Sequence, residues 1–148
     1  MAHTHAARAI IQATDGRWLL VRPTSADLWH LPGGGIAQGE PPRQACEREI
    51  HEELGLTLSA GRLRAVQWTP LPDDGGDQIS LVFDCGVHDP ADIEAHITLQ
   101  ADEVEAWRWG TPDADLLDGD RLAEALLQAS ARPDHVAYLE VATTPSAT

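Results

Sequence analysis

Residues 34–56 read GGIAQGEPPRQACEREIHEELGL, and this stretch carries the clearest structural signal in the chain of 148 residues. We predict one helix over Glu40 to Leu54, because Pro41 and Pro42 suit a first helical turn, where no backbone donor is needed. Gly55 then supplies the left-handed residue that commonly ends a helix. The apolar face of this helix is expected to contain the residues that recur every four positions, Cys46, Ile50 and Leu54.

Three glutamates, Glu49, Glu52 and Glu53, are expected on one side of the same helix. Their spacings of three and four residues place the carboxylates within roughly one third of the helix circumference. Like charges at this spacing destabilise a helix by about 0.2–0.5 kcal/mol per pair, so a cation is expected among them. Hard oxygen ligands suit Mg²⁺ or Mn²⁺, which also take phosphate oxygens as ligands. Taken alone, the same pattern is also typical of an acidic helix face exposed to solvent, and the surrounding sequence decides between the two interpretations.

The spacing around these glutamates carries a family resemblance. Gly34 is followed after five residues by Glu40, and after seven more by REIHEELGL at residues 48–56. Nine of these residues, all of those quoted except His51 and Leu54, stand at fixed positions of the Nudix box and match it, so the chain resembles the Nudix hydrolases. The resemblance continues upstream through WHLPGG at residues 29–34 and more weakly downstream to Trp109, which is about the middle two thirds of the chain.

The resemblance implies a chemistry and a set of site residues. Nudix enzymes hydrolyse a nucleoside diphosphate linked to another group, and they cut the phosphoanhydride with a divalent metal. The implied cofactor is Mg²⁺ or Mn²⁺, which neutralises the diphosphate and lowers the pKa of a bound water molecule. The implied metal ligands are Glu49, Glu52, Glu53 and Gly34. The implied substrate contacts include Gly33 and Gly34.

The implied catalytic residues are Arg48, Glu52, Glu53 and Glu103. For Arg48 we expect an ion pair with Glu40 that holds the loop to the helix, rather than direct participation in the reaction. Some family members take the general base from the loop before the strand that ends in tryptophan, and Glu103 stands in such a place, six residues before Trp109. The alternatives are its neighbours Asp102 and Glu105, and Glu52 inside the box. Each of these acids is also compatible with an ordinary surface position in an acidic protein.

Composition limits the partners of the protein. Lys and Arg total 10 against 24 Asp and Glu, which gives a formal net charge of −14. Binding to DNA, RNA or an anionic membrane needs a basic surface, so we expect neither a nucleic acid polymer nor a membrane as partner. No apolar run approaches the roughly 20 residues of a membrane span, and the N-terminus lacks a secretion signal. We therefore expect a cytoplasmic protein that acts on a small nucleotide, with a homodimer as an option.

Apolar stretches on both sides of the helix predict a single domain over residues 1–142. The first two, Ala6 to Gln12 and Trp18 to Val21, flank an Asp-Gly hairpin signal and are expected to pair. Four further strands are predicted at Leu63 to Trp68, Gln78 to Cys85, Ile93 to Leu99 and Val104 to Trp109. A turn is predicted at Pro32 to Gly35, a mobile acidic loop at residues 70–77, and a closing helix at Arg121 to Ala129.

This element order predicts an α/β or α+β sandwich. The resemblance makes it a Nudix-like α/β/α sandwich, with a mixed central sheet flanked by helices. Residues 143–148 are expected to be a disordered tail. Cys46 and Cys85 are expected to be buried small residues rather than a disulfide or a metal pair. Among the five tryptophans, Trp68 is the candidate for stacking on a nucleobase, because it ends a strand beside the acidic loop.

The sequence leaves the substrate open. In some subfamilies a proline at a set distance beyond the box accompanies ADP-ribose hydrolysis, and Pro70 and Pro72 straddle that distance. A small single domain equally resembles the sanitising nucleoside triphosphate pyrophosphatases, whereas the tyrosine of the dinucleoside polyphosphate hydrolases is absent. The alternative of another class is a catalytically silent nucleotide sensor, although such modules usually lack box carboxylates. A diphosphate isomerase is disfavoured, because its arrangement of cysteine and glutamate is not identifiable.

Overall fold

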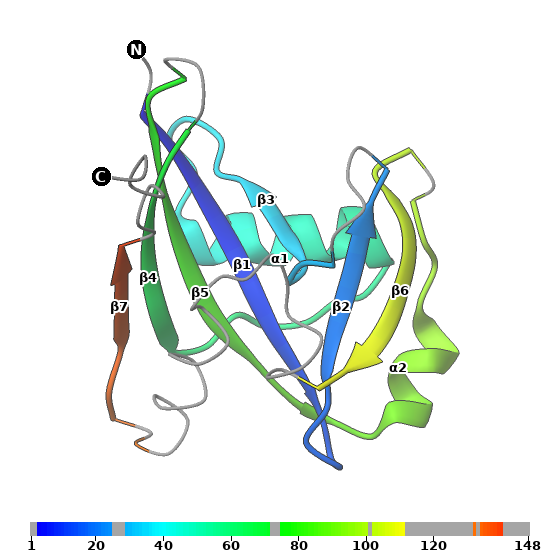
Figure 1. The fold of residues 1–148 in the computed structure, drawn as a ribbon. Helices are drawn as coiled ribbons and strands as arrows, with labels where there is room; N and C mark the ends of the chain where they lie inside the picture. The colour runs from blue at the N-terminus through cyan, green and yellow to red at the C-terminus, as the bar shows by residue number, and fades with distance from the viewer. Residues whose placement is uncertain are drawn as a thin grey trace, which may run out of the picture.

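The computed structural model describes residues 3–24, 29–71, 75–100, 102–111, 132 and 134–140. Within these ranges the chain forms one mixed sheet of seven strands with two helices, α1 (Pro42–Leu54) and α2 (Pro90–His96). Figure 1 shows α1 lying across one face of the sheet and α2 beside the edge of the sheet that β6 forms. Neither helix is both long enough and apolar enough to cross a bilayer.

The strands are β1 (His3–Ala13), β2 (Trp18–Pro23), β3 (Gly33–Gly35), β4 (Leu63–Pro70), β5 (Asp77–His88), β6 (Val104–Gly110) and β7 (Ala137–Glu140). Their order in the sheet is β6-β2-β1-β5-β4-β7, and β3 pairs with β1 outside this path. The pairs β1–β5 and β4–β7 are parallel and the others are antiparallel. The predicted mixed sheet flanked by helices is confirmed.

On the side opposite β5, strand β1 pairs with two partners, β3 and β2, and this arrangement positions the backbone of β3 for the site. Its first half pairs with β3 at three positions, whereas it pairs with β2 at one position, Gln12 opposite Trp18. Strand β2 then continues along β6 (Figure 1). The predicted hairpin of the first two strands is therefore present, but the two strands diverge beyond their turn.

The box helix α1 begins at Pro42, two residues after the predicted start. Before it, the Glu40 carboxylate and the Glu40 N–H bond the backbone of Ala37, which keeps this segment in a turn. At the other end Gly55 adopts φ 69°, the left-handed conformation predicted for it, and its N–H donates to the carbonyl of His51.

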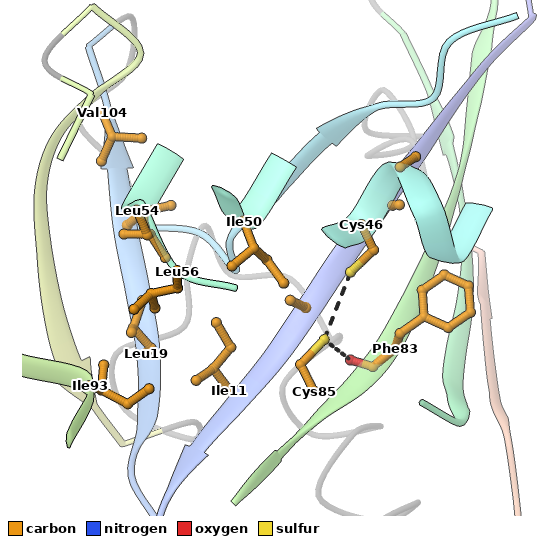
Figure 2. Packing of buried hydrophobic residues seen from close by; sticks show 14 residues of the cluster. Ile11, Leu19, Cys46, Ile50, Leu54, Leu56, Phe83, Cys85, Ile93 and Val104 are labelled. Atoms are coloured by element: carbon orange, nitrogen blue, oxygen red, sulfur yellow. Dashed lines mark hydrogen bonds between the residues drawn. The ribbon is translucent and has the colours of Figure 1, made fainter. Parts of the chain in front are cut away.

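Apolar side chains are buried on both faces of the sheet. On the α1 side, Ile50 and Leu54 pack against β1 and β2, as Figure 2 shows. Cys46 and Cys85 belong to this cluster; both are buried and unbridged, as predicted, with their sulfur atoms 3.8 Å apart. A second cluster contains the alternate residues of the strands, Ile10, Trp18, Leu20, Leu31, Ala65 and Val82. Burial on both faces gives the sheet the central position that a sandwich requires.

The strand predicted at Ile93 to Leu99 is wrong, because this segment begins in α2. The side chain of Asp89 accepts the N–H of Ala91 at 2.9 Å, and Pro90 occupies the first helical turn. An N-cap followed by proline favours a helix start, and this local signal outweighs the alternation of apolar residues that follows.

Other differences concern short or distant elements. The turn predicted at Pro32 to Gly35 contains β3, and β7 lies where no element is predicted. The predicted helix at Arg121 to Ala129 and the predicted tail at 143–148 lie outside the described residues, as do residues 72–74 of the predicted mobile loop.

Candidate active site

The site is built where α1 meets β3. Glu49 and Glu53 lie one turn apart on α1. Glu53 is only 7% exposed, and its Oε1 accepts the backbone N–H of Gly33 at 2.8 Å. A carboxylate that accepts a backbone N–H is held in one orientation, so Glu53 is fixed before any ligand arrives.

Two glycines of β3 bring its backbone against the carboxylates and against β1. A Cβ atom on Gly34 would lie 2.7–2.8 Å from the carboxylate carbon and both oxygens of Glu49. A Cβ atom on Gly33, which has φ +143°, would lie 2.0 Å from the carbonyl oxygen of Ala7. A side chain at Gly34 would displace the Glu49 carboxylate, and a side chain at Gly33 would disrupt the pairing of β3 with β1. Both positions therefore require glycine for this arrangement.

Glu103 reaches the same point from a distant part of the chain. It precedes β6, and its carbonyl accepts the N–H of Thr24 at 3.3 Å, which ties it to the end of β2. Carboxylate oxygens of Glu49, Glu53 and Glu103 all lie within 4.8 Å of one another. We call these three residues the carboxylate cluster. Its carboxylate oxygens are the ligands that Mg²⁺ and Mn²⁺ prefer. Gly34, which has no side chain, leaves room for the Glu49 carboxylate. The residues therefore fit such an ion.

The electrostatics of the cluster favour a cation. Burial raises the pKa of Glu53 to about 7; the Gly33 N–H opposes this, the charges of Glu49 and Glu103 add to it, and the charge of Arg8 opposes it. Burial also raises the pKa of Glu49. Burial beside other carboxylates makes ionisation of these groups unfavourable, and a bound cation offsets this cost because it stabilises their ionised form.

Arg48 organises the residues around the cluster. Its Nε and Nη2 donate to the two carboxylate oxygens of Glu40 at 2.8 and 3.0 Å, and Nη2 also donates to the carbonyl of Gly35 at 2.9 Å. Its Nη1 donates to Glu49 and Glu52, both at 3.1 Å. The predicted ion pair of Arg48 with Glu40 is confirmed, and the hydrogen bonds from Arg48, together with that from the Ala37 N–H, lower the pKa of Glu40 to about 2.

The structure separates the four acids considered as general base. Glu103 belongs to the carboxylate cluster. The carboxylate of Glu105 pairs with Arg22 at 3.2 Å, and the carbonyl of Asp102 accepts the hydroxyl of Thr24 at 3.3 Å. Glu52 is directed to Arg48, and its side chain is 43% exposed. The roles of Glu52 as a metal ligand and as a base stay predictions.

Trp68, the candidate for nucleobase stacking, lies on β4, and β5 separates that strand from β1. Its indole N–H donates to the Asp77 carboxylate at 3.2 Å, between the neighbouring ends of β4 and β5. The structure does not bring Trp68 to the carboxylate cluster, and its contact with a substrate stays a prediction.

One residue near the site was missed by the sequence analysis. Arg8 lies on β1 directly opposite Gly33, and its Nη1 donates to the carbonyl of Leu31 at 3.3 Å. The available signal was an arginine inside the otherwise apolar stretch AARAII at residues 6–11. Its position became visible only with the pairing of β3 and β1, which no sequence pattern predicted.

The comparison with known proteins agrees with this geometry. The NUDIX domain family model matches residues 2–128. The chain belongs to the NUDIX family. The family resemblance predicted from the box is therefore confirmed.

Individual relatives differ in what their names say they act on. An RNA pyrophosphohydrolase of Vibrio atlanticus is 33% identical over 101 residues, which is 55% of this chain and 55% of that protein. The chain therefore spans little more than half the length of this curated relative. A MutT NUDIX hydrolase from Burkholderia pseudomallei is 27% identical with a TM-score of 0.69, and the match covers 87% of this chain and 98% of that one. A UDP-X diphosphatase is 25% identical with a TM-score of 0.72, and the match covers 94% and 68% of the two chains.

Proposed function

We propose that this NUDIX protein hydrolyses the phosphoanhydride bond of a nucleoside diphosphate linked to another group, with Mg²⁺ or Mn²⁺ as cofactor. The observation that carries the proposal is the carboxylate cluster, because three acids from α1 and the start of β6 converge within 4.8 Å beside a glycine backbone. Without a cation this convergence is unfavourable, since the three negative charges repel one another.

Glu49 and Glu53 would hold the divalent ion, with Gly34 beside them and the Glu103 carboxylate next to the site. When bound, such an ion neutralises the charge of a diphosphate and lowers the pKa of a water molecule. The chain's own residues prepare this site: Gly33 orients Glu53, and Arg48 orients Glu49. Arg48 thus acts as a positioning residue.

Glu103 is the proposed general base. It is exposed, whereas Glu53 is buried and bonded to Gly33, so Glu103 has greater freedom to accept a proton from water. In the proposed reaction a water oxygen forms a bond to phosphorus and the bridging P–O bond breaks. The proton of the water goes to a Glu103 carboxylate oxygen, and the departing phosphate takes the bond electrons. General base catalysis of this kind typically accelerates a reaction by about 10²–10⁴.

The proposed substrates are nucleoside triphosphates or compounds of the ADP-ribose and nucleotide-sugar type. The names of the relatives given above support a diphosphate as the part that their substrates share. The group attached to the diphosphate differs between an RNA pyrophosphohydrolase and a UDP-X diphosphatase. A silent nucleotide sensor is the weaker alternative, because the cluster and Arg48 are all present. The cytoplasmic location and the homodimer stay predictions.

The proposal is tested with a panel of nucleoside triphosphates, ADP-ribose and nucleotide sugars, by measuring the nucleotide and phosphate released with Mg²⁺, with Mn²⁺ and with excess chelator. We expect turnover of at least one member that depends on metal. Binding of a nucleotide by calorimetry without turnover of any member would favour the sensor, and full turnover in chelator would contradict the metal-dependent reaction.

A further inference from the structure

A hollow of about 730 Å³ opens on the α1 face of the sheet, beside the first turn of α1. Its floor contains side chains near the starts of β1 and β5, namely His5, Ile79 and Leu81, and its wall contains residues 35–40 and Pro42. Leu81 also packs against the buried cluster under α1, which identifies the face of the sheet. Pockets that bind small molecules typically enclose about 300–1,000 Å³, so this hollow is large enough to be one.

The hollow borders the carboxylate cluster. Gly34, which packs against the Glu49 carboxylate, is followed directly by Gly35, which lines the hollow. One guanidinium spans the border: Nη1 of Arg48 donates to Glu49 at 3.1 Å, and its Nη2 donates to the carbonyl of Gly35 at 2.9 Å. A ligand whose phosphates lie at the cluster can therefore extend its other end into the hollow.

The lining of the hollow suits an uncharged group. Among the described residues that line it there is no arginine, and its one acid, Glu40, is paired with Arg48. A second hollow beside Arg48, between α1 and residues 57–59, is lined by two acids, Glu47 and Glu52, and is less suited to a substrate that carries phosphates. The first hollow combines apolar side chains with hydrogen-bonding groups, and these residues are Ile36, Ala37, Pro42, Ile79 and Leu81, and Thr4, His5 and Gln38.

Trp68 adds a flat aromatic ring next to the floor of the hollow. It pairs with Ile79 between β4 and β5, and Ile79 pairs with His5 between β5 and β1. Paired side chains point to the same face of a sheet, so these three residues form a row across three strands, with a spacing of about 4.8 Å. The row places the indole of Trp68 on the α1 face, beside the hollow.

The ring of Trp68 also differs from those of the other partly exposed tryptophans. Trp29 contacts two arginines, and Trp107 and Trp109 contact each other. Trp68 uses its N–H for Asp77, but within the described part of the chain no aromatic ring or guanidinium lies over its face. An aromatic face of this kind can stack on a nucleobase.

We propose that the hollow and Trp68 form a base site, in which the nucleobase of the substrate lies against the indole while its diphosphate lies at the carboxylate cluster. This inference rests on the proposed function and deepens it, because it gives the nucleoside end of the substrate a place. Three strand spacings separate Gly35 on β3 from Trp68 on β4, which is roughly 14 Å, and a nucleoside with its diphosphate can span this length. Stacking tolerates every base, so the polar groups of His5 and Gln38 are left to select among them.

The test uses Trp68→Leu and Trp68→Phe in the full chain, with Trp109→Leu as a control that removes an indole from β6, at the other edge of the sheet. The probes are the α,β-methylene analogues of ADP, GDP, UDP and CDP, and methylenediphosphonate, which lacks the nucleoside. Their binding is measured by calorimetry in the presence of Mn²⁺. We expect the parent to bind at least one nucleotide analogue more tightly than methylenediphosphonate.

Trp68→Leu should weaken the binding of that analogue about 5- to 100-fold, the usual effect of losing one stacked base, and should leave the affinity for methylenediphosphonate unchanged. Trp68→Phe should retain most of the affinity, and Trp109→Leu should bind both probes like the parent.

Three results would overturn the inference. The parent could bind no analogue more tightly than methylenediphosphonate, or Trp68→Leu could bind the analogue as the parent does. Trp68→Leu could also lose affinity for both probes equally, which would show that Trp68 supports the fold. Failure of the proposed function looks different, since the parent would then hydrolyse no member of the substrate panel, whereas binding of the analogues is measured without turnover.

Discussion

Replacing Glu53 by glutamine tests whether this buried carboxylate is maintained for a cation rather than for stability. In the folded protein without metal, burial raises the pKa of Glu53 from 4.5 to about 7. The folded state therefore holds the proton more tightly than the unfolded state, and the free energy of unfolding falls as pH rises from about 4.5 to about 7. The difference between these pKa values corresponds to about 3 kcal/mol above pH 7. Glutamine does not ionise, and its amide oxygen can still accept the Gly33 N–H.

In chelator at pH 8, Glu53→Gln should therefore melt above the parent, by roughly 6–12 °C for a stability gain of this size. The assay follows the melting temperature between pH 4.5 and pH 8, with Glu47→Gln as the control on the same helix. Glu47 accepts the N–H of Ala60 at 2.8 Å, a bond that glutamine can also make. Parallel curves for the parent and Glu53→Gln would refute the reasoning, and a variant that melts well below the parent would show that Glu53 is a structural residue.

Addition of metal should reverse the order of the two proteins. A ligand that binds only the folded state stabilises it by mass action. Mg²⁺ or Mn²⁺ should raise the melting temperature of the parent and leave that of Glu53→Gln nearly unchanged. The variant should also be inactive, whereas Glu47→Gln should respond to metal like the parent.

Three further perturbations address other parts of the site. Glu103→Gln should lower kcat by roughly 10²–10⁴ with little change in KM, and steady-state kinetics showing a loss below tenfold would move the role of base elsewhere. Gly34→Ala should abolish most activity because its Cβ would displace the Glu49 carboxylate, whereas Gly35→Ala, with nothing within 4 Å of its Cβ, should retain it. Comparable activity of the two alanine variants would contradict the packing argument. The lowered pKa of Glu40 stabilises the fold above about pH 4.5, and this contribution is lost as pH falls toward 2; an acid-unfolding curve of Glu40→Gln should therefore be flatter in that range.

The fold could be predicted where a local pattern has one physical solution. The fourfold apolar spacing of Cys46, Ile50 and Leu54 and the cap at Gly55 specify α1 without reference to the rest of the chain. The segment from Ile93 to Leu99 carries two competing signals, the alternation of apolar residues and the preceding Asp89 cap, and the cap decides its local structure. Strand β3 could not be predicted, because three glycines have no side-chain pattern and the strand exists through its pairing with β1.

For the candidate site too, residues that share one helix could be predicted together, whereas contacts between distant segments could not. Spacing on one helix places Glu49 and Glu53 together, and it places Glu52 nearby equally well. Only the contact with Arg48 shows where the Glu52 carboxylate is directed. Glu103 was found through the family resemblance, and its approach to the cluster depends on the pairing of β2 with β6. Arg8 was missed, since its place opposite Gly33 is a matter of register between distant segments.

The most direct test of the central claim is a titration of the chelator-treated protein with Mn²⁺, followed by electron paramagnetic resonance of the free ion. The parent should bind Mn²⁺, Glu49→Gln and Glu53→Gln should each lose most of that affinity, and Glu47→Gln should keep it. The account would be contradicted if the two cluster variants bound Mn²⁺ as tightly as the parent, because the convergence of Glu49, Glu53 and Glu103 would then have no cation to explain it.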